Sequence, residues 1–310
     1  MTEFGSFFRY FCYRPAAVLK VTGEDAFPFL QGQFSQDLRS VCEDDHVVYG
    51  LWLNQKGKVL ADSSVLHIGS DWLVISLFSS AQTIRERLEA YVIADDVRVE
   101  DMTAQWAGVS ILEAGQGETL KKCAGVELPE AGHFVRSKDG VIFQGRRARV
   151  PNWEWLYPVG ADGQELGLRD CGGTEFDFGA MERLRIESGI PAVPRDIGPE
   201  DLPNEGGLDR DAISYTKGCY LGQEVMARLR TMGQVRRQLL RVAGPVASPV
   251  ILPAPLFVDG KKVGELRSAM GVKEGFVGLA MISLKGMTGR RLLSFSPDSS
   301  ADIVINDGSA

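Results

Sequence analysis

Residues 217–224 read KGCYLGQE, and this stretch is the densest group of reactive side chains in the sequence. It places an amine, a thiol, a phenol, an amide and a carboxylate within eight positions. Two glycines allow the backbone to approach another group closely. The charge of Lys217 would favour a reactive thiolate at Cys219. Free cysteines are also often buried as small apolar residues, and the residues alone favour such a buried turn over a reactive site.

A run of arginines follows this stretch, in a chain that is acidic overall. The chain has 34 Lys and Arg against 41 Asp and Glu, a formal net charge of −7. Net acidity argues against non-specific nucleic-acid binding, which needs a basic surface. The local positive field can receive carboxylates or phosphates, or it can be a solvated face, and the pattern leaves both open. The arginines are Arg228, Arg230, Arg236, Arg237 and Arg241.

Two acidic residues stand where their local structure disfavours them. Residues 174–188 are predicted to form a helix with Thr174 as its cap, and Glu187 would lie against the negative end of the helix dipole. The alternative for Glu187 is a surface ion pair with Arg183 or Arg185. Asp62 lies inside a predicted strand, where Asp is uncommon, and the alternative is an edge position facing water.

The rest of the chain alternates strand and helix patterns. A strand over 18–21 leads into a helix capped by Thr22, an antiparallel meander covers 47–78, and a helix covers 80–92. Two further strands are expected within 96–112. This order predicts a small α+β domain with a helix packed on an antiparallel sheet. Short strands with frequent turns over 238–310 predict an antiparallel barrel or sandwich.

Composition excludes several classes of protein. The 310 residues are 44% hydrophobic and 24% charged, which is ordinary for globular proteins and unlike disordered chains. No apolar run approaches the length of a membrane span, and the first residues lack the features of a signal peptide, so we expect a cytoplasmic protein that does not contact a membrane. Five cysteines without a CxxC pair and three isolated histidines predict neither a structural metal site nor a disulfide framework.

Several segments in order resemble the folate-binding YgfZ-type family. The stretch at 217–224 matches the family signature K-G-C-[FY]-x-G-Q-E. VTGEDAFPFLQGQFSQDL, NQKGKVLADSSVLHIGSDWLVIS and ERLRIESGIP resemble other family segments, and the resemblance is weakest over 113–170. The family is related to the T-protein of the glycine cleavage system, an aminomethyltransferase.

The resemblance implies an α+β protein with three domains arranged as a ring around a central folate cavity. Residues 1–46 together with 113–237 are expected to form a split first domain that carries the RIESG and KGCYLGQE motifs. Residues 47–112 would form an inserted ferredoxin-like α+β domain of antiparallel sheet plus helix. Residues 238–310 would form a C-terminal antiparallel β-barrel.

The resemblance also implies a ligand and the residues that bind it. The cofactor is expected to be tetrahydrofolate or a one-carbon-substituted folate. Glu187 matches the T-protein glutamate that hydrogen-bonds the pterin, and a carboxylate can accept two N–H bonds in fork geometry. The anionic glutamate tail suits the arginines. The expected catalytic residues are Cys219, Lys217 and Asp62. The expected cofactor-binding residues are Glu187, Arg185, Tyr220, Gln223, Glu224, Arg228, Arg236 and Arg237.

Three functions are considered, two implied by this resemblance and a third suggested by the arginines between Arg228 and Arg241. The first is a tetrahydrofolate-binding accessory protein that supports assembly or repair of iron–sulfur clusters in client enzymes, with Cys219 as its reactive residue. The partners would be iron–sulfur client or assembly proteins, without a stable metal on this chain. The second is a one-carbon transferase of the aminomethyltransferase or demethylase type, weakened because T-proteins carry paired acids where this chain keeps only Asp62. The third is an RNA-binding scaffold, disfavoured by the net charge.

Overall fold

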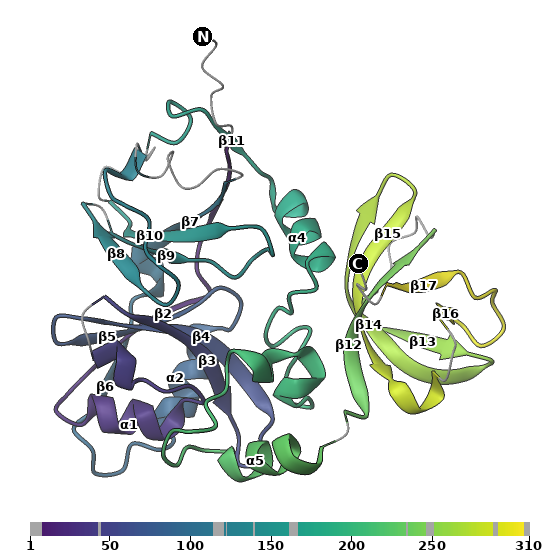
Figure 1. Ribbon diagram of the computed structural model, residues 1–310, viewed down its shortest axis with the longest axis horizontal. Helices are drawn as coiled ribbons and strands as arrows, with labels where there is room; N and C mark the ends of the chain where they lie inside the picture. Colours follow the sequence, from purple (N-terminus) through teal and green to yellow (C-terminus); the bar gives the residue numbers. More distant parts are fainter. Residues whose placement is uncertain are drawn as a thin grey trace.

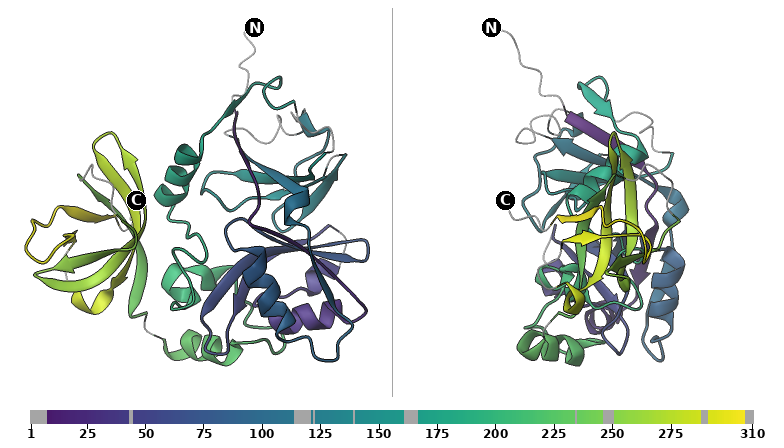
Figure 2. Two further views of the ribbon diagram at one scale, coloured as in Figure 1. Left: turned by 180° about the vertical axis from the view of Figure 1, so that it is seen from behind. Right: turned by 90° about the vertical axis from the view of Figure 1, so that its right-hand side faces the viewer.

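Three β-sheets make up the protein in its computed structural model (Figure 1). The structure describes residues 8–42, 45–113, 121, 123–138, 140–160, 167–233, 235–245, 251–287 and 291–306. Two sheets are stacked on one side of the molecule, and the third stands beside them, as the view from behind also shows (Figure 2). We call them the first, second and barrel sheets.

The first sheet combines the start of the chain with strands from its middle. Its order is β11-β1-β7-β10-β9-β8, antiparallel except for the parallel pair β1 and β11. Helix α4 (Phe178–Glu187) follows β11 in the chain. The strands are β1 (Phe8–Tyr13), β7 (Trp106–Glu113), β8 (Phe134–Ser137), β9 (Gly140–Gln144), β10 (Asn152–Pro158) and β11 (Gly173–Glu175).

The second sheet has the order β3-β4-β5-β2-β6, with antiparallel pairing throughout. Its members are β2 (Ala17–Thr22), β3 (Val47–Leu53), β4 (Val59–Ile68), β5 (Asp71–Ser76) and β6 (Arg98–Asp101). Helices α1 (Ala26–Gln33) and α2 (Ala81–Glu89) cover one face, where Leu30 and Ile84 pack with Leu19 and Trp52. The short helices η1 (Arg39–Cys42) and η2 (Thr103–Gln105) lie in its connections.

The two stacked sheets share a core because neighbouring side chains on a strand point to opposite faces. Leu19 packs under the helices, whereas Val18 packs on the other face with Ile75. There both belong to one buried cluster with the first-sheet residues Phe143 and Leu156. The meander expected over 47–78 is therefore present, and it is apolar on both faces.

The barrel sheet has the order β13-β14-β15-β12-β17-β16. An isolated bridge between Phe257 and Ser294 brings its two edge strands together, so the sheet is nearly closed and barrel-like. The expected C-terminal antiparallel barrel is confirmed. The strands are β12 (Arg237–Gly244), β13 (Ala254–Val258), β14 (Lys261–Val272), β15 (Gly275–Ser283), β16 (Leu292–Leu293) and β17 (Ile303–Asn306), with η6 (Leu284–Gly286) after β15.

A connecting segment runs from α4 to the barrel sheet and contains η4 (Pro203–Gly206), η5 (Leu208–Arg210) and α5 (Gln223–Met232). It is not structureless, although its Pro, Gly and acidic residues suggested a long loop. A core cluster joins it to its neighbours, because Val193 and Tyr220 pack with Leu53 of the second sheet and Met281 of the barrel sheet.

The sheets divide the chain differently from the expected ranges. Strand β2 lies in the expected first domain, 1–46, yet it pairs with β5 and β6 of the second sheet. Strand β7 lies in the expected insertion, 47–112, yet it pairs with β1 and β10 of the first sheet. Strands β6 and β7 are therefore neighbours in sequence but belong to different sheets. Local patterns predicted each strand, whereas its partner depends on contacts far along the chain.

The helix starts also differ from expectation. Thr22 ends β2, and Asp25 precedes α1. Thr174 lies in β11, and Asp177 caps α4 by accepting the N–H of Ala180 at 2.7 Å. In both cases an aspartate nearer the helix takes the cap position, although the Asp25 carboxylate accepts the N–H of Asp96 instead of a helix N–H.

Cysteine pairing corrects one further expectation. Cys123 and Cys171 form a disulfide, although the cysteine spacing predicted no disulfide framework. Cys12 and Cys219 are free thiols. Within the described ranges, no group of three or more His, Cys, Asp or Glu side chains could hold a metal ion. No helix in the described part of the chain is long and apolar enough to cross a membrane.

Candidate functional site

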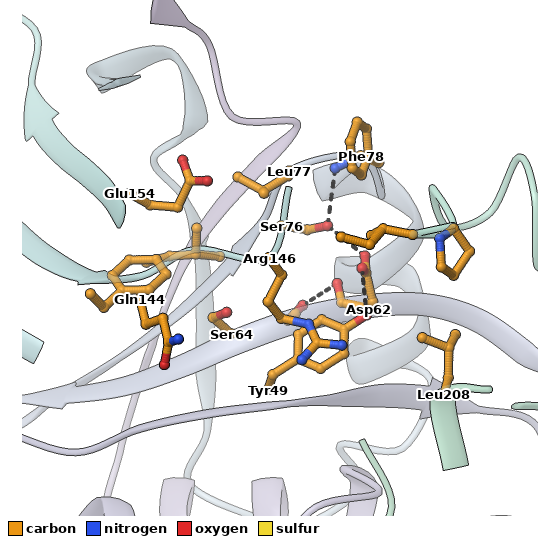
Figure 3. Close-up of a pocket in the computed structure, with 15 residues that line it drawn as sticks. Tyr49, Asp62, Ser64, Ser76, Leu77, Phe78, Gln144, Arg146, Glu154 and Leu208 are labelled. Carbon is orange, nitrogen blue, oxygen red and sulfur yellow. Dashed lines mark hydrogen bonds between the residues drawn. The ribbon is translucent and has the colours of Figure 1, made fainter. Parts of the chain in front are cut away.

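A narrow cavity lies where the first sheet, the second sheet and the connecting segment meet (Figure 3). Its space is about 40 Å³, room for roughly three water molecules. A larger ligand therefore requires the lining side chains to move apart. The polar lining residues used below come from the second sheet (Tyr49, Asp62 and Ser76) and from the first sheet and the turn after it (Gln144, Arg146 and Glu154).

Asp62 lies on β4 with its carboxylate inside the cavity lining (Figure 3). One of its oxygens accepts hydrogen bonds from Ser76 at 2.8 Å and Ser79 at 2.7 Å. The other oxygen accepts one from the hydroxyl of Tyr49 at 3.0 Å. Burial raises the pKa of Asp62, and the three hydroxyls oppose that rise. Asp62 is thus a buried and fully hydrogen-bonded carboxylate, not an edge residue facing water.

Arg146 supplies positive charge beside this carboxylate. Its guanidinium stacks over the Tyr49 ring, 3.8 Å from the centroid, and forms an ion pair with Asp211 at 2.6 Å. Its side chain is 35% exposed, so it is held mainly by surface contacts. Ion pairs at this exposure are weak, so the contacts of Arg146 oppose its displacement only modestly.

Glu154 is a second buried carboxylate in the lining, on the side of the cavity opposite to Asp62 (Figure 3). It lies on β10, and only 1% of its surface is exposed. Its Oε2 accepts hydrogen bonds from Tyr13 at 2.6 Å and Ser110 at 2.7 Å. Burial raises the pKa of Glu154, whereas the nearby Arg147 lowers it.

Glu187 ends helix α4 and lies outside the cavity lining. Its carboxylate forms an ion pair with Arg183 at 2.7 Å, and both side chains are largely exposed. Its carbonyl accepts a hydrogen bond from Arg241 of the barrel sheet at 2.8 Å. The chain enters the cavity lining three residues later, at Ile190 and Pro191. The alternative considered from the sequence, a surface pair with Arg183, is thus the arrangement seen.

Arg185 is buried and connects three parts of the chain. It donates two bonds to Glu182 of its own helix and one to Asp196 of the connecting segment. It also donates to Ser268 of β14 at 3.0 Å. The guanidinium is occupied by these partners and by the carbonyl of Ile190, so Arg185 holds α4 against the barrel sheet.

The ammonium of Lys217 is buried and binds backbone instead of a ligand. It donates to the carbonyls of Gln31 at 2.6 Å, Phe34 at 2.8 Å and Gln36 at 3.0 Å. These carbonyls lie at and just beyond the end of α1, where helix carbonyls lack internal donors. Burial lowers the pKa of Lys217 to about 8. All three N–H groups are used, so Lys217 fastens the connecting segment to α1.

The other residues of the motif surround the start of α5. Cys219 is exposed, contrary to the buried turn that the residues alone favoured. Tyr220 is buried, and its hydroxyl has no hydrogen-bond partner among the described residues. Gln223 begins α5 and donates to the carbonyl of Lys217 at 3.4 Å. Glu224 is exposed and pairs with Arg228 one turn later.

A basic groove lies between α5, η4 and the start of the barrel sheet, separate from the narrow cavity. Its space is about 1180 Å³, and its cationic lining residues are Arg228, Arg236, Arg237 and Lys285. Arg237 is already bound to Glu205 and Asp201. Arg236 and Lys285 are exposed. The groove can therefore attract an anion mainly through Arg236, Lys285 and the exposed Arg228.

The structure thus separates the candidates predicted from the sequence. Asp62 lines the cavity, Glu187 and Arg185 belong to α4, and the motif residues lie around α5. Sequence reasoning missed Tyr49, Arg146 and Glu154 in the lining. Glu154 carried a signal that could have been used: it is an acid inside the apolar run NWEWLYP, a pattern that places a carboxylate on a buried strand.

Comparison with known proteins gives the relatives of this chain. Residues 15–152 match the GCVT N-terminal domain family. The tRNA-modifying protein YgfZ of Yersinia pestis (strain Pestoides F) is 27% identical over 269 residues, 84% of this chain and 80% of that protein. YgfZ of Vibrio vulnificus (strain YJ016) is 25% identical over 231 residues, 74% of this chain and 68% of that protein.

A third relative is a chloroplastic protein of Arabidopsis thaliana whose name calls it a transferase only provisionally. It is 28% identical over 273 residues, 83% of this chain, and the match spans 60% of that protein. Among solved structures, the glycine cleavage system aminomethyltransferase T from Bartonella henselae has a TM-score of 0.80 at 17% identity. The match covers 97% of this chain and 85% of that chain. The expected resemblance and the T-protein-like fold are both confirmed.

Proposed function

Because the chain is a relative of the YgfZ-type proteins and has the fold of an aminomethyltransferase T-protein, we propose that it binds tetrahydrofolate. In this proposal it is a cytoplasmic accessory protein that supports assembly or repair of iron–sulfur clusters in client enzymes. The supporting observation is the cavity with two buried carboxylates, Asp62 and Glu154. A reduced pterin carries several N–H groups, and carboxylates are the strongest acceptors for them.

The residues of this chain fit the parts of a folate. The pterin enters the cavity when Arg146 moves aside, and Asp62 with its hydroxyl partners orients it. Glu187 contacts the pterin edge after leaving Arg183. The glutamate tail lies in the basic groove against Arg228, Arg236 and Lys285, since Arg237 is paired with Glu205 and Asp201. Bound tetrahydrofolate would supply one-carbon chemistry at its reduced ring nitrogen.

The test of folate binding is anaerobic calorimetric titration with tetrahydrofolate. We expect wild-type binding and a loss of roughly 1.5–3 kcal/mol for Asp62→Asn and for Glu187→Ala, the range of a charge-assisted hydrogen bond. Asp298→Asn, an exposed acid on the barrel side, is the matched control and should bind as wild type does. No binding by the wild-type protein would refute the folate proposal.

The accessory role rests on Cys219, which is exposed and stands next to the first turn of α5. An exposed thiol can reach a client protein or a cluster in transfer, whereas a buried one cannot. We expect Cys219→Ala to fold and to bind tetrahydrofolate, but to lose support of iron–sulfur enzyme activity in a deletion strain. Cys12→Ala, a free thiol of β1, should retain that support. Full support by Cys219→Ala would exclude this role.

A folate-dependent one-carbon transferase is the second candidate. Asp62 favours it, because a buried carboxylate with a raised pKa is suited to proton transfer. Formation of methylene-tetrahydrofolate from an aminomethyl or N-methyl donor would establish this activity, and Asp62→Asn should abolish it. No product across a panel of such donors would count against it.

A further inference from the structure

The hydroxyl of Ser79 lies between two buried acceptors and has one hydrogen to donate. Ser79 is 1% exposed and follows β5 in the chain. Its Oγ lies 2.7 Å from Oδ1 of Asp62 and 2.9 Å from the backbone carbonyl oxygen of Val193 in the connecting segment. Both are hydrogen-bond distances. Because one O–H group cannot donate fully to two acceptors, Asp62 and Val193 compete for the hydrogen of Ser79.

The carbonyl of Val193 depends on this hydrogen. Val193 is fully buried, and Ser79 supplies the one donor to its carbonyl among the described residues. A carboxylate is a stronger acceptor than a backbone carbonyl, so an ionised Asp62 takes the hydrogen of Ser79. The carbonyl of Val193 is then buried without a donor, which costs free energy.

A proton on Asp62 removes this shortage. An Asp62 carboxyl protonated at Oδ1 donates to Ser79, and Ser79 then donates to Val193. The Oγ of Ser79 already accepts the N–H of Asp62 at 3.0 Å, so it accepts two hydrogens and donates one, the full capacity of a hydroxyl. Ser76 still donates to Oδ1 at 2.8 Å, and Tyr49 donates to the other oxygen at 3.0 Å. The neutral form of Asp62 thus satisfies one more buried group than the ionised form.

The charged groups around Asp62 are already paired. Arg146 lines the cavity beside Asp62 and forms an ion pair with Asp211. Glu154 lines the opposite side, with Arg147 3.4 Å away. Burial raises the pKa of Asp62 and outweighs the opposing effects of the hydroxyls and of Arg146. The connecting segment contributes only uncharged residues to the lining, namely Ile190, Pro191 and Leu208.

We infer that Ser79 is a positioning residue that turns its hydrogen from Asp62 to Val193 when Asp62 takes up a proton. The O–H bond of Ser79 rotates and does not break, and the proton comes from water or from a ligand in the cavity. The rotation links the charge of Asp62 to the connecting segment, which reaches the cavity at Ile190 and Pro191. It also keeps Asp62 hydrogen-bonded in both forms, so Asp62 can accept a pterin N–H or exchange a proton. This last step rests on the proposed function.

Carbon-13 NMR of the ligand-free full chain tests the inference without a folate. Aspartate side-chain carboxyls and valine backbone carbonyls are labelled, and Asp62→Asn and Val193→Ile assign the two signals. We expect the Val193 carbonyl signal to shift with pH at the same midpoint as the Asp62 carboxyl signal. The carbonyl of Val150, which accepts from the amide of Asn152 at 2.8 Å, is the matched control and should not shift at that midpoint.

Two outcomes of this titration would overturn the inference. One is a Val193 signal that stays constant while Asp62 titrates. The other is an Asp62 carboxyl that keeps one charge state over the whole pH range in which the protein is folded. Neither outcome depends on a variant at Ser79 or on folate binding.

Two variants distinguish this role from a purely structural one. Ser79→Ala removes the charge-assisted bond to Asp62, so we expect the Asp62 midpoint to rise by roughly one pH unit and the Val193 signal to stop titrating. Tyr49→Phe removes another donor to Asp62 but no contact with Val193, so the midpoint should rise while the Val193 signal still follows it. A Val193 signal that still titrates in Ser79→Ala would contradict the inference.

Calorimetry of the same variants measures the consequence for the ligand. If Asp62 accepts a pterin N–H, tetrahydrofolate should bind the wild-type protein more weakly as the pH falls through the Asp62 midpoint, and this dependence should move upward by roughly one pH unit in Ser79→Ala. An unmoved pH profile would overturn this part. No binding of tetrahydrofolate to the wild-type protein would refute the proposed function, whereas the NMR result for Ser79 would stand.

Discussion

Single buried polar residues separate structural from ligand-binding roles in this protein. Lys217 and Asp62 are both buried, but Lys217 donates its three N–H groups to backbone carbonyls, whereas Asp62 lines a cavity. A buried charge is tolerated only when it is hydrogen-bonded, so the hydrogen-bond partners of each residue indicate its role. Lys217 therefore holds the connecting segment to α1, whereas Asp62, which accepts from three hydroxyl donors, lines a cavity.

Replacement of Lys217 tests its structural role. We expect Lys217→Met to lower the free energy of unfolding by about 2–4 kcal/mol, because three carbonyls lose a charged donor. Urea denaturation measures this value. Lys261→Met, at an exposed strand position, should change it by less than about 0.5 kcal/mol. A Lys217→Met protein as stable as wild type would show that the three hydrogen bonds contribute little.

Asp62 should make stability depend on pH. Burial raises its pKa in the folded chain, so the folded state binds the proton more tightly than the unfolded state does. Ionisation therefore costs stability as the pH rises above the unfolded value of about 4. We expect the stability of Asp62→Asn relative to wild type to increase as the pH is raised above about 4, measured by urea denaturation over a pH series. A constant difference across that range would contradict the expectation.

At the scale of elements, helix α4 carries two arginines with opposite roles. Arg185 is 1% exposed and joins Glu182, Asp196 and Ser268, which belong to α4, the connecting segment and β14. Arg183 is half exposed and contacts Glu187 on the same helix. The two positions are two residues apart, so their side chains lie on nearly opposite faces of α4, one against the barrel sheet and the other in solvent.

The two arginines should therefore respond differently to replacement. We expect Arg185→Met to lower the free energy of unfolding by about 3–5 kcal/mol, because it leaves buried Asp196 without the Arg185 cation and leaves Glu182 with the half-exposed Arg195. Arg183→Ala should change it by less than about 1 kcal/mol. Denaturation of both variants compares them under identical conditions. Equal losses would mean that the buried network does not hold the helix.

Arg183→Ala also tests how Glu187 becomes available. The substitution removes the ion pair that now occupies the Glu187 carboxylate. If Glu187 contacts the pterin, the variant should bind tetrahydrofolate with equal or higher affinity, measured by calorimetry. A lower affinity would indicate that Arg183, or the pair itself, contacts the ligand.

At the scale of the whole molecule, the connecting segment joins the stacked sheets to the barrel sheet and borders both candidate binding regions. Leu208 lines the narrow cavity, whereas Leu202 and Asn204 line the basic groove. The same short segment thus has the cavity at one end and the groove at the other. A long ligand with a heterocycle at one end and carboxylates at the other matches this layout.

The layout predicts a dependence on the length of the glutamate tail. We expect Arg236→Ala combined with Lys285→Ala to weaken the binding of tetrahydrofolate with several glutamates by roughly 1–2 kcal/mol, and the binding of the monoglutamate by less. The effect is limited to this range because the groove is exposed and its charges are screened by salt. Titrations of both ligands at low and high salt measure this. Equal effects on the two ligands would mean that the tail binds elsewhere. Binding of RNA to the wild-type protein, lost in the double variant, would mean that the groove takes RNA instead.

Much of the fold could be predicted from the sequence, because strand and helix periods are local. The meander over 47–78, the helix after Ser80 and the barrel strands after 238 followed from apolar spacing. The family resemblance followed from short motifs, and the relatives and the T-protein-like structure confirm it. Asp62 was identified because an acid inside a strand is unusual, and that signal depends on its neighbours along the chain alone.

Only the tertiary structure decided which strands share a sheet and which polar groups share a cavity. β2 and β7 joined sheets other than those expected, since strand pairing is set by contacts far apart in sequence. Glu154 and Asp62 are 92 positions apart in the chain and meet only because the two sheets stack. The sequence suggested that the charge of Lys217 acts on Cys219. In the structure its ammonium instead binds carbonyls at the end of α1, because a buried charge needs hydrogen-bond partners.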